Sequence, residues 1–284
     1  DIQLEVLDWG GTGRPVVLLP GGGNTAHVFD DFAPKLTSDF HVYGITRRGF
    51  GESGFAPLTS GSDTFGDDVL AVLDALALER PVLVGHSIGG QELSSIGTRY
   101  PNRVAGLVYL DAGYPYAFDN GRIPTFKEIT EVGFPQAPPP TDADLATFDG
   151  LRQYYTHVLG FTYPEGELRQ QRSTRPDGGV GPPRPFPGGR SLLAGPKQYV
   201  QIQTPSLFLV SSQSPGRWAE TSTDPKIKEQ MAAMSALLER QAKSIEDGLP
   251  RARVVKLPGA HHYVFLSNEA DVLREMRAFL GSLR

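Results

Sequence analysis

Short, continuous apolar runs alternate along this chain with stretches of helical periodicity. The run at residues 16–19, Val-Val-Leu-Leu, is apolar throughout and stops at a proline and three glycines, as expected for a strand buried on both faces. Further runs occupy residues 4–7, 42–45, 81–84, 104–110, 206–210 and 253–257, and the helical stretches occupy 67–78, 88–100, 226–245 and 271–280. This alternation predicts an α/β protein with a mostly parallel central sheet and helices on both faces.

Residues 112–200 break this alternation. They hold 13 of the 24 prolines and 12 of the 27 Phe, Tyr and Trp residues, and they lack a strong strand pattern. Within them, residues 175–195 are dominated by Pro, Gly and Arg, as a linker would be, but the whole segment is too long and too aromatic to be only a linker. We expect one core, residues 1–111 and 201–284, with residues 112–200 inserted as a cap or lid that has a helix at 148–159.

Charge and composition argue against several classes of protein. The formal net charge is −5 and no basic run is present, so a nucleic acid is not an expected partner. No apolar stretch approaches the roughly 20 residues that span a bilayer, so we expect no membrane span. The lack of cysteine excludes a disulfide scaffold, a thiolate metal site and a cysteine nucleophile.

The first residue is Asp1 rather than methionine. A cleaved export signal would account for this start, and so would a shortened or disordered upstream segment. We expect an exported protein, periplasmic or secreted, rather than a cytoplasmic one.

The sequence Gly85-His86-Ser87-Ile88-Gly89 is a G-x-S-x-G pattern set between a predicted strand and a predicted helix. A nucleophile elbow requires this strand–turn–helix setting, because its tight turn leaves the serine hydroxyl exposed above the sheet. Glycine is needed at positions 85 and 89, where a side chain would collide with neighbouring backbone. A serine that merely caps an ordinary helix is the alternative. We interpret Ser87 as a catalytic nucleophile.

A serine that attacks a carbonyl creates an oxyanion, which needs backbone N–H donors. The N–H of Ile88 is one donor by its position, and the loop after the early strand should supply the other. That loop, residues 20–24, reads Pro-Gly-Gly-Gly-Asn, and its glycines let the backbone approach a substrate closely. A flexible turn and a phosphate cradle are alternatives, but a phosphate loop would carry a following Lys-Ser or Lys-Thr, which is absent from the sequence.

Four motifs resemble, in this order, the α/β-hydrolase superfamily: LLPGGGNTAHVFDDF, YGITRRGFGES, VLVGHSIGG and LPGAHHYVFL. The resemblance covers nearly the whole chain except the cap, and it implies the α/β-hydrolase fold. Many members have His-Gly-x in the first motif. Here Pro20 stands in place of that histidine, and Gly22 matches the second oxyanion donor. In the second motif Thr46 stands where an Asp is common, and we interpret residues 48–53 as structural.

The resemblance also implies that nucleophile, acid and histidine follow one another in this order along the chain. Of the six histidines, this leaves His261 and His262 as candidates for the base. The superfamily pattern is Gly-His followed by an aromatic residue, before a final helix. His262, followed by Tyr263, fits this pattern best, with His261 in the usual place of the glycine. His86, beside the nucleophile, is expected to pack against the elbow.

Most superfamily members carry the catalytic acid after the strand that follows the cap, in a pattern like Pro-Thr-Leu-x-x-x-Gly-x-x-Asp. The matching residues 205–214 end in Gln-Ser, so a serine occupies the place of the acid. Asp111 directly follows the strand next after the nucleophile strand, and loops at the carboxyl edge of a parallel sheet face one crevice. We expect Asp111 to be the acid, with Glu220 or Asp224 as alternatives.

Together these residues indicate acyl transfer to water: a carboxylic-ester hydrolase that forms an acyl-enzyme on Ser87, with His262 as base and Asp111 as acid. Dehalogenases and epoxide hydrolases of this fold use an Asp nucleophile, and Ser87 argues against both. A lactonase or a carbon–carbon bond hydrolase on the same residues remains open, as does a ligand receptor on a hydrolase scaffold. No metal ion or cofactor is expected, because no metal-ligand spacing appears.

The aromatic residues of the predicted cap also bear on the substrate. They favour a small ester with an apolar or aromatic group, although the cap's own small core must account for many of them. We expect Gly23, His86, Tyr114 and Tyr116 to contact this substrate.

Overall fold

The fold is built on a central β-sheet. The computed structural model describes residues 2–58, 61–192 and 198–283, which contain a seven-stranded sheet. Its strands, in spatial order, are β1 (Val6–Gly10), β3 (His41–Ile45), β2 (Pro15–Leu19), β4 (Val82–His86), β5 (Gly106–Leu110), β8 (Ser206–Ser211) and β9 (Ala252–Leu257). β1 runs antiparallel to β3, and the other strand pairs are parallel. The predicted mostly parallel sheet is confirmed, and each predicted strand overlaps an observed one.

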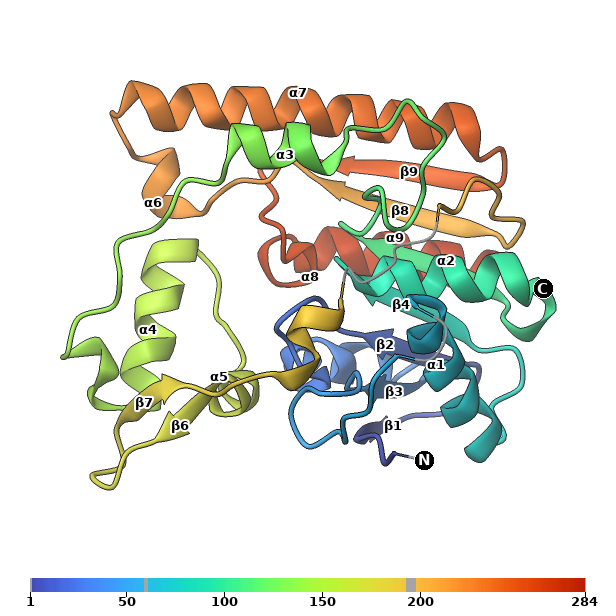
Figure 1. Cartoon of the computed structure of the whole chain (residues 1–284), viewed down its shortest axis with the longest axis horizontal. Helices are drawn as coiled ribbons and strands as arrows, with labels where there is room; N and C mark the ends of the chain where they lie inside the picture. Colours follow the sequence, from blue (N-terminus) through green and yellow to red (C-terminus); the bar gives the residue numbers. More distant parts are fainter. Residues whose placement is uncertain (1, 59–60, 193–197, 284) are drawn as a thin grey trace.

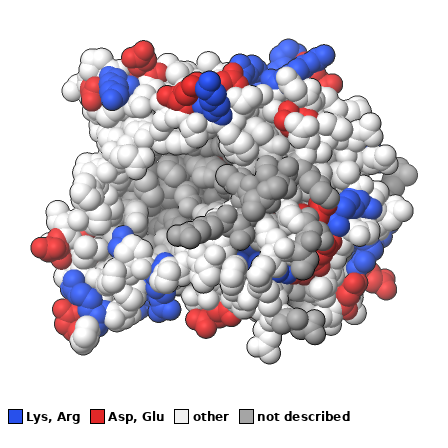
Figure 2. Space-filling model, in the orientation of Figure 1, with Lys and Arg blue, Asp and Glu red and all other residues white. Residues whose placement is uncertain are grey.

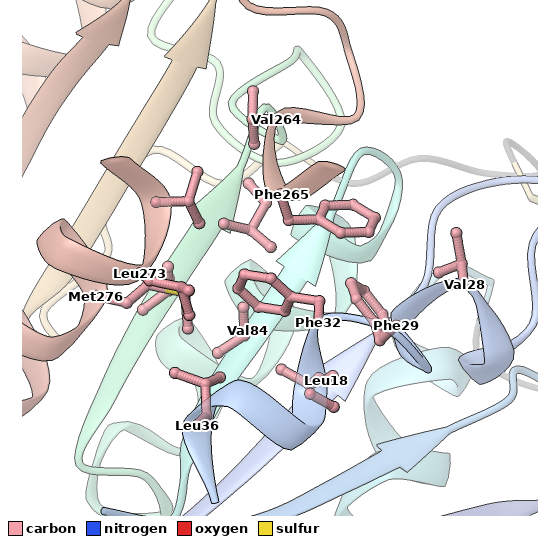
Figure 3. Packing of buried hydrophobic residues seen from close by; sticks show 14 of the residues in the cluster. Leu18, Val28, Phe29, Phe32, Leu36, Val84, Val264, Phe265, Leu273 and Met276 are labelled. Atoms are coloured by element: carbon pink, nitrogen blue, oxygen red, sulfur yellow. The ribbon is translucent and has the colours of Figure 1, made fainter. Parts of the chain in front are cut away.

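Helices cover both faces of the sheet, as predicted. Along β2, Val16 and Leu18 join one buried cluster and Val17 and Leu19 another, because successive side chains of a strand point to opposite faces. One cluster includes residues of η1 (Ala26–Phe29), η2 (Ala33–Leu36), α8 (Val264–Ser267) and α9 (Glu269–Ser282), and the other includes residues of α1 (Asp63–Ala75), α2 (Gly89–Arg99) and α7 (Pro225–Gly248). Figure 3 shows the first cluster, built around Phe29, Phe32 and Phe265. None of the helices in the described ranges has the length and apolarity of a membrane span.

The chain between β5 and β8 forms its own small elements. α4 (Phe148–Leu159) begins and ends at the predicted residues, because Thr147 caps it by accepting from Gly150 N at 2.9 Å and Gly160, at φ +87°, ends it. The sequence did not predict α3 (Phe126–Val132), α5 (Glu165–Gln171) or the hairpin of β6 (Arg172–Thr174) and β7 (Val180–Pro183). In Figure 1, α4, α5 and the hairpin lie beyond the carboxyl ends of the strands, whereas α3 lies along α7. The cap boundaries at 112 and 200 stay a prediction, and residues 193–197 lie outside the described residues.

Candidate active site

Ser87 lies on the tight turn between β4 and α2. Its backbone is in the left-handed region, at φ +49°, which residues with a side chain rarely adopt. A Cβ on Gly85 would lie 2.7 Å from the carbonyl carbon of Gly89, and a Cβ on Gly89 would lie 2.9 Å from the oxygen of Leu19. The turn therefore needs glycine at both positions, as the pattern predicts. Backbone strain of this kind is typical of functional sites, and a nucleophile elbow is one of them.

Asp111 and His262 form a direct pair at the carboxyl edge of the sheet. Asp111 directly follows β5, the neighbour of β4, and its side chain is fully buried. His262 Nδ1 donates to Asp111 Oδ2 over 2.6 Å. A carboxylate in this place fixes the imidazole tautomer and leaves Nε2 as the nitrogen that can take up a proton.

Three further donors hold the Asp111 carboxylate. Ser211 N donates to Oδ1 over 3.0 Å, and the Tyr114 hydroxyl donates to Oδ2 over 3.1 Å. Gln213 Nε2 donates to Oδ2 over 2.6 Å and lies 3.1 Å from His262 Nδ1. A buried carboxylate that accepts this many hydrogen bonds is fixed in orientation.

The alternative acids lie elsewhere. Glu220, on α6 (Arg217–Glu220), accepts from Ser214 Oγ over 2.7 Å. Asp224 caps the first turn of α7 by accepting from Lys226 N over 2.8 Å. Of the three carboxylates considered from the sequence, the structure brings Asp111 to His262.

His261 has a different environment from its neighbour. Its Nδ1 accepts from the Tyr263 N–H over 3.1 Å, and its ring packs against Phe161 at a centroid distance of 5.1 Å. Burial lowers the pKa of His261 to about 3, so the ring stays neutral at physiological pH. The structure therefore gives His261 a packing position, while its neighbour His262 has the carboxylate partner.

The predicted oxyanion loop, residues 20–24, passes directly over the elbow, and in the structure the loop continues to Thr25, the residue before η1. A Cβ on Gly21 would lie 3.2 Å from the Cβ of Ser87, and a Cβ on Gly22 would lie 3.8 Å from Ile88 Cγ2. Within the described ranges, neither the Gly22 N–H nor the Ile88 N–H donates to a backbone carbonyl of a turn or loop. The structure therefore places Gly22 beside Ile88, and these contacts leave both N–H groups without a backbone acceptor.

Arg47 supports this loop from the core. Its guanidinium donates to the carbonyl of Pro20 over 2.8 Å and to that of Gly21 over 3.4 Å. It is buried and paired with Glu92 of α2 over 2.5 Å. The sequence did not single out Arg47, although it lies in the motif that resembles the superfamily. The arrangement ties the oxyanion loop to the helix that follows the nucleophile.

A cavity of about 530 Å³ opens above Ser87 and His262. Its described lining is mostly aromatic and aliphatic and includes no Asp, Glu, Lys or Arg. The apolar and aromatic lining residues are Tyr114, Tyr116, Phe126, Ile129, Phe134, Pro135, Ala137, Leu159, Pro215, Trp218 and Tyr263. Figure 2 shows a hollow on the face that carries α3 and α4. A cavity of this size and lining suits a small, neutral, apolar ligand.

The predicted substrate contacts divide into two groups. Tyr114 and Tyr116 line the cavity together with Ser87, and burial raises the pKa of the Tyr116 hydroxyl. Gly23 and His86 are not among the described lining residues. His86 is buried, donates from Nε2 to the His262 carbonyl over 3.1 Å, and has its pKa lowered well below the usual value by burial. It packs behind the elbow, as expected, rather than against the cavity.

Comparisons with known proteins agree with this arrangement. The model of the alpha/beta hydrolase family matches residues 16–275. Among curated proteins, the chain is 34% identical over 103 residues to a putative non-heme haloperoxidase of Mycobacterium phage D29, covering 36% of this chain and 37% of that protein. It is 33% identical over 118 residues to a bifunctional esterase/perhydrolase of Acinetobacter calcoaceticus, covering 40% and 42%. Each alignment thus spans under half of the curated relative.

Solved structures match over the whole length at lower identity. An E-2-(acetamidomethylene)succinate hydrolase superimposes with a TM-score of 0.64 at 18% identity, covering 99% of this chain and 96% of that one. A thermophilic esterase from Thermogutta terrifontis superimposes with a TM-score of 0.61 at 21% identity, covering 98% and 93%. At these identities the likeness shows the fold alone. Together with the family match over most of the chain, it shows that this protein belongs to the alpha/beta hydrolase family.

Proposed function

We propose that this protein is a carboxylic-ester hydrolase that forms an acyl-enzyme on Ser87. The observation that carries the proposal is the 2.6 Å contact between His262 Nδ1 and the buried Asp111 carboxylate, beside a strained elbow serine that lines the same cavity. These features support the roles of a nucleophile, its base and the group that orients the base.

The proposed reaction has two halves. His262 Nε2 takes the Ser87 proton as Oγ attacks the ester carbonyl carbon, and the N–H groups of Gly22 and Ile88 stabilise the oxyanion. When the tetrahedral intermediate collapses, His262 returns the proton to the leaving alcohol oxygen. Water, deprotonated by His262, then attacks the acyl-enzyme carbonyl carbon. As the second tetrahedral intermediate collapses, His262 returns this proton to Ser87 Oγ, and the carboxylic acid is released. Asp111 stabilises the imidazolium in both halves.

The lining of the cavity supports a neutral ester as the substrate. A free carboxylate on the substrate would be buried among aromatic side chains without a cationic partner among the described lining residues. An unpaired buried charge costs several kcal/mol, so kcat/KM for a hemiester with a free carboxylate should fall about 100-fold or more below that of the neutral diester. The comparison of such a matched pair, with phenyl acetate as an apolar reference, tests this. Faster cleavage of the carboxylate-bearing ester would contradict the proposed substrate class.

The two adjacent histidines provide a test of the base. His262→Gln should lower kcat about ten-thousand-fold or more, because proton transfer and imidazolium stabilisation are both lost. His261→Gln, the matched control, should stay within about tenfold of the wild type, because a neutral packing residue transfers no proton. Steady-state kinetics on an aryl ester distinguish the two. If His261→Gln loses activity and His262→Gln keeps it, the base is His261.

A substrate panel separates the remaining activities. Lactones and carbon–carbon bond substrates would be cleaved by the same residues, so a preference for either over aryl esters would change the assigned reaction but not the site. A ligand receptor on this scaffold would turn over very slowly. Turnover well above once per minute on any ester of the panel rules out that alternative.

A further inference from the structure

A buried carboxylate from the region of the cap contacts the oxyanion loop. Glu167, on α5, is fully buried. It accepts from Thr25 Oγ1 over 2.5 Å, from Thr25 N over 3.1 Å and from Asn24 Nδ2 over 2.9 Å. Gln171, at the end of the same helix, donates from Nε2 to Glu167 over 2.9 Å and to the Gly23 carbonyl over 3.3 Å. Two side chains of α5 therefore hold three consecutive residues of the loop.

Asn24 extends this contact to the loop that carries the base. Its Nδ2 also donates to the Tyr163 hydroxyl over 2.7 Å, and its Oδ1 accepts from the Tyr263 hydroxyl over 3.0 Å. Tyr263 directly follows His262 in the chain. One buried hydrogen-bond network thus joins α5, the oxyanion loop and the histidine loop.

Gly22, the predicted oxyanion donor, lies between two supports. Arg47 holds the carbonyls of Pro20 and Gly21 from the core, and the Glu167 network holds the residues from Gly23 onward. A Cβ on Gly23 would meet nothing within 4 Å, so close packing does not fix this part of the loop. We propose that Glu167 is a positioning residue that keeps the Gly22 N–H directed at the oxyanion, so that catalysis requires α5 to be seated on the loop. This inference rests on the function proposed above.

The chemistry of Glu167 supports a role beyond attaching α5 to the oxyanion loop. Within the described residues its hydrogen-bond partners are all neutral donors, and burial raises the pKa of Glu167 to about 7. Burying a carboxylate without a cation is unfavourable, and an apolar contact would attach α5 equally well. Two carboxylate oxygens can, however, accept from backbone and side-chain donors of the loop at the same time, which fixes its orientation.

The test compares two variants of α5 with a matched control. Glu167→Gln keeps the shape but places an NH₂ group where one oxygen accepted hydrogen bonds, and Gln171→Ala removes the contact to Gly23. Glu165→Gln is the control, because Glu165 lies on the same helix, is only partly buried, and forms an ion pair with Arg169 at 2.6 Å. For each variant we would measure kcat, KM, the melting temperature and the rate at which a fluorophosphonate labels Ser87.

A displaced oxyanion donor should lower kcat for Glu167→Gln by about 10- to 100-fold and change KM less than about threefold, since the donor acts mainly in the transition state. Labelling should slow in parallel, because the phosphonate oxygen uses the same donors. Gln171→Ala should also lower kcat and the labelling rate, by a smaller factor. If Glu167→Gln does not fold, the kcat of Gln171→Ala is the measurement that tests the inference. Glu165→Gln should match the wild type.

Three outcomes would overturn the inference. If Glu167→Gln folds and keeps the wild-type kcat and KM, Glu167 has no positioning role. A rise in the KM of Glu167→Gln without a fall in kcat would also contradict that role, because it would show that Glu167 acts on substrate binding instead. If Glu167→Gln fails to fold and Gln171→Ala keeps the wild-type kcat, Glu167 has a structural role only. If the wild-type protein shows neither ester turnover nor labelling at Ser87, the proposed function itself fails, and the inference fails with it.

Discussion

Ser87→Ala is expected to lower kcat for short p-nitrophenyl esters by about a million-fold, as loss of the nucleophile does in other serine hydrolases. The hydroxyl is the group that forms the acyl-enzyme, and the oxyanion donors alone provide a small residual rate. The fold should be retained, because alanine keeps the Cβ and the backbone contact from Ser87 N to the Leu110 carbonyl, at 3.2 Å, does not involve the side chain.

Fluorophosphonate labelling followed by peptide mapping provides the control for this variant. The wild-type protein should be labelled on the peptide that contains Ser87, and Ser87→Ala should not be labelled at all. Equal activity in the folded variant, or labelling of another serine in the wild-type protein, would refute the assignment of the nucleophile.

Asp111→Asn is expected to lower kcat about ten-thousand-fold, because an amide donor facing His262 Nδ1 favours the wrong tautomer of the imidazole. The fold should be retained, since the amide oxygen can still accept from Ser211 N. Labelling of Ser87 should continue at a reduced rate. Glu220→Gln and Asp224→Asn are the matched controls and should stay near the wild-type activity, because neither carboxylate contacts His262.

A second substitution sharpens this test. Gln213 Nε2 lies 3.1 Å from His262 Nδ1, so Gln213→Glu places a carboxylate beside the same nitrogen. In the Asp111→Asn background it should recover about tenfold or more of the lost activity, because an acid again holds the imidazolium. If Asp111→Asn retains wild-type kinetics while Glu220→Gln or Asp224→Asn collapses, the acid lies after β8 instead.

The sheet and the elbow could be predicted because their signals are local. Uniformly apolar runs specify buried parallel strands, and glycines at 85 and 89 are needed by one tight turn. α4 could be located for the same reason, since its capping residue, its periodicity and its terminal glycine are contiguous. The predicted start of α1 came later than the observed Asp63, because its first turn lacks apolar periodicity.

The elements that were missed depend on contacts distant in sequence. The β6–β7 hairpin lies in a Pro- and Gly-rich stretch whose composition resembles a linker, and α3 packs against α7, which comes about a hundred residues later. Glu167 belongs to the run Glu-Gly-Glu-Leu-Arg-Gln-Gln, which has the composition of an exposed helix. Nothing in that run shows that one of its carboxylates is buried against Asn24 and Thr25.

The placement of Asp111 puts the proposed acid directly after the strand next to the nucleophile strand. Ser87 and Asp111 end adjacent strands, β4 and β5, whose register is fixed by backbone pairing from Val82 with Gly106 to His86 with Leu110. The proposed nucleophile and the proposed acid therefore both precede residues 112–200 in the chain. Length changes in that segment leave their spacing intact, and the turn after β8 carries no charge essential to the pair. On the proposed mechanism, we expect residues 112–200 to be replaceable by another segment, provided that the new segment restores the support of the oxyanion loop.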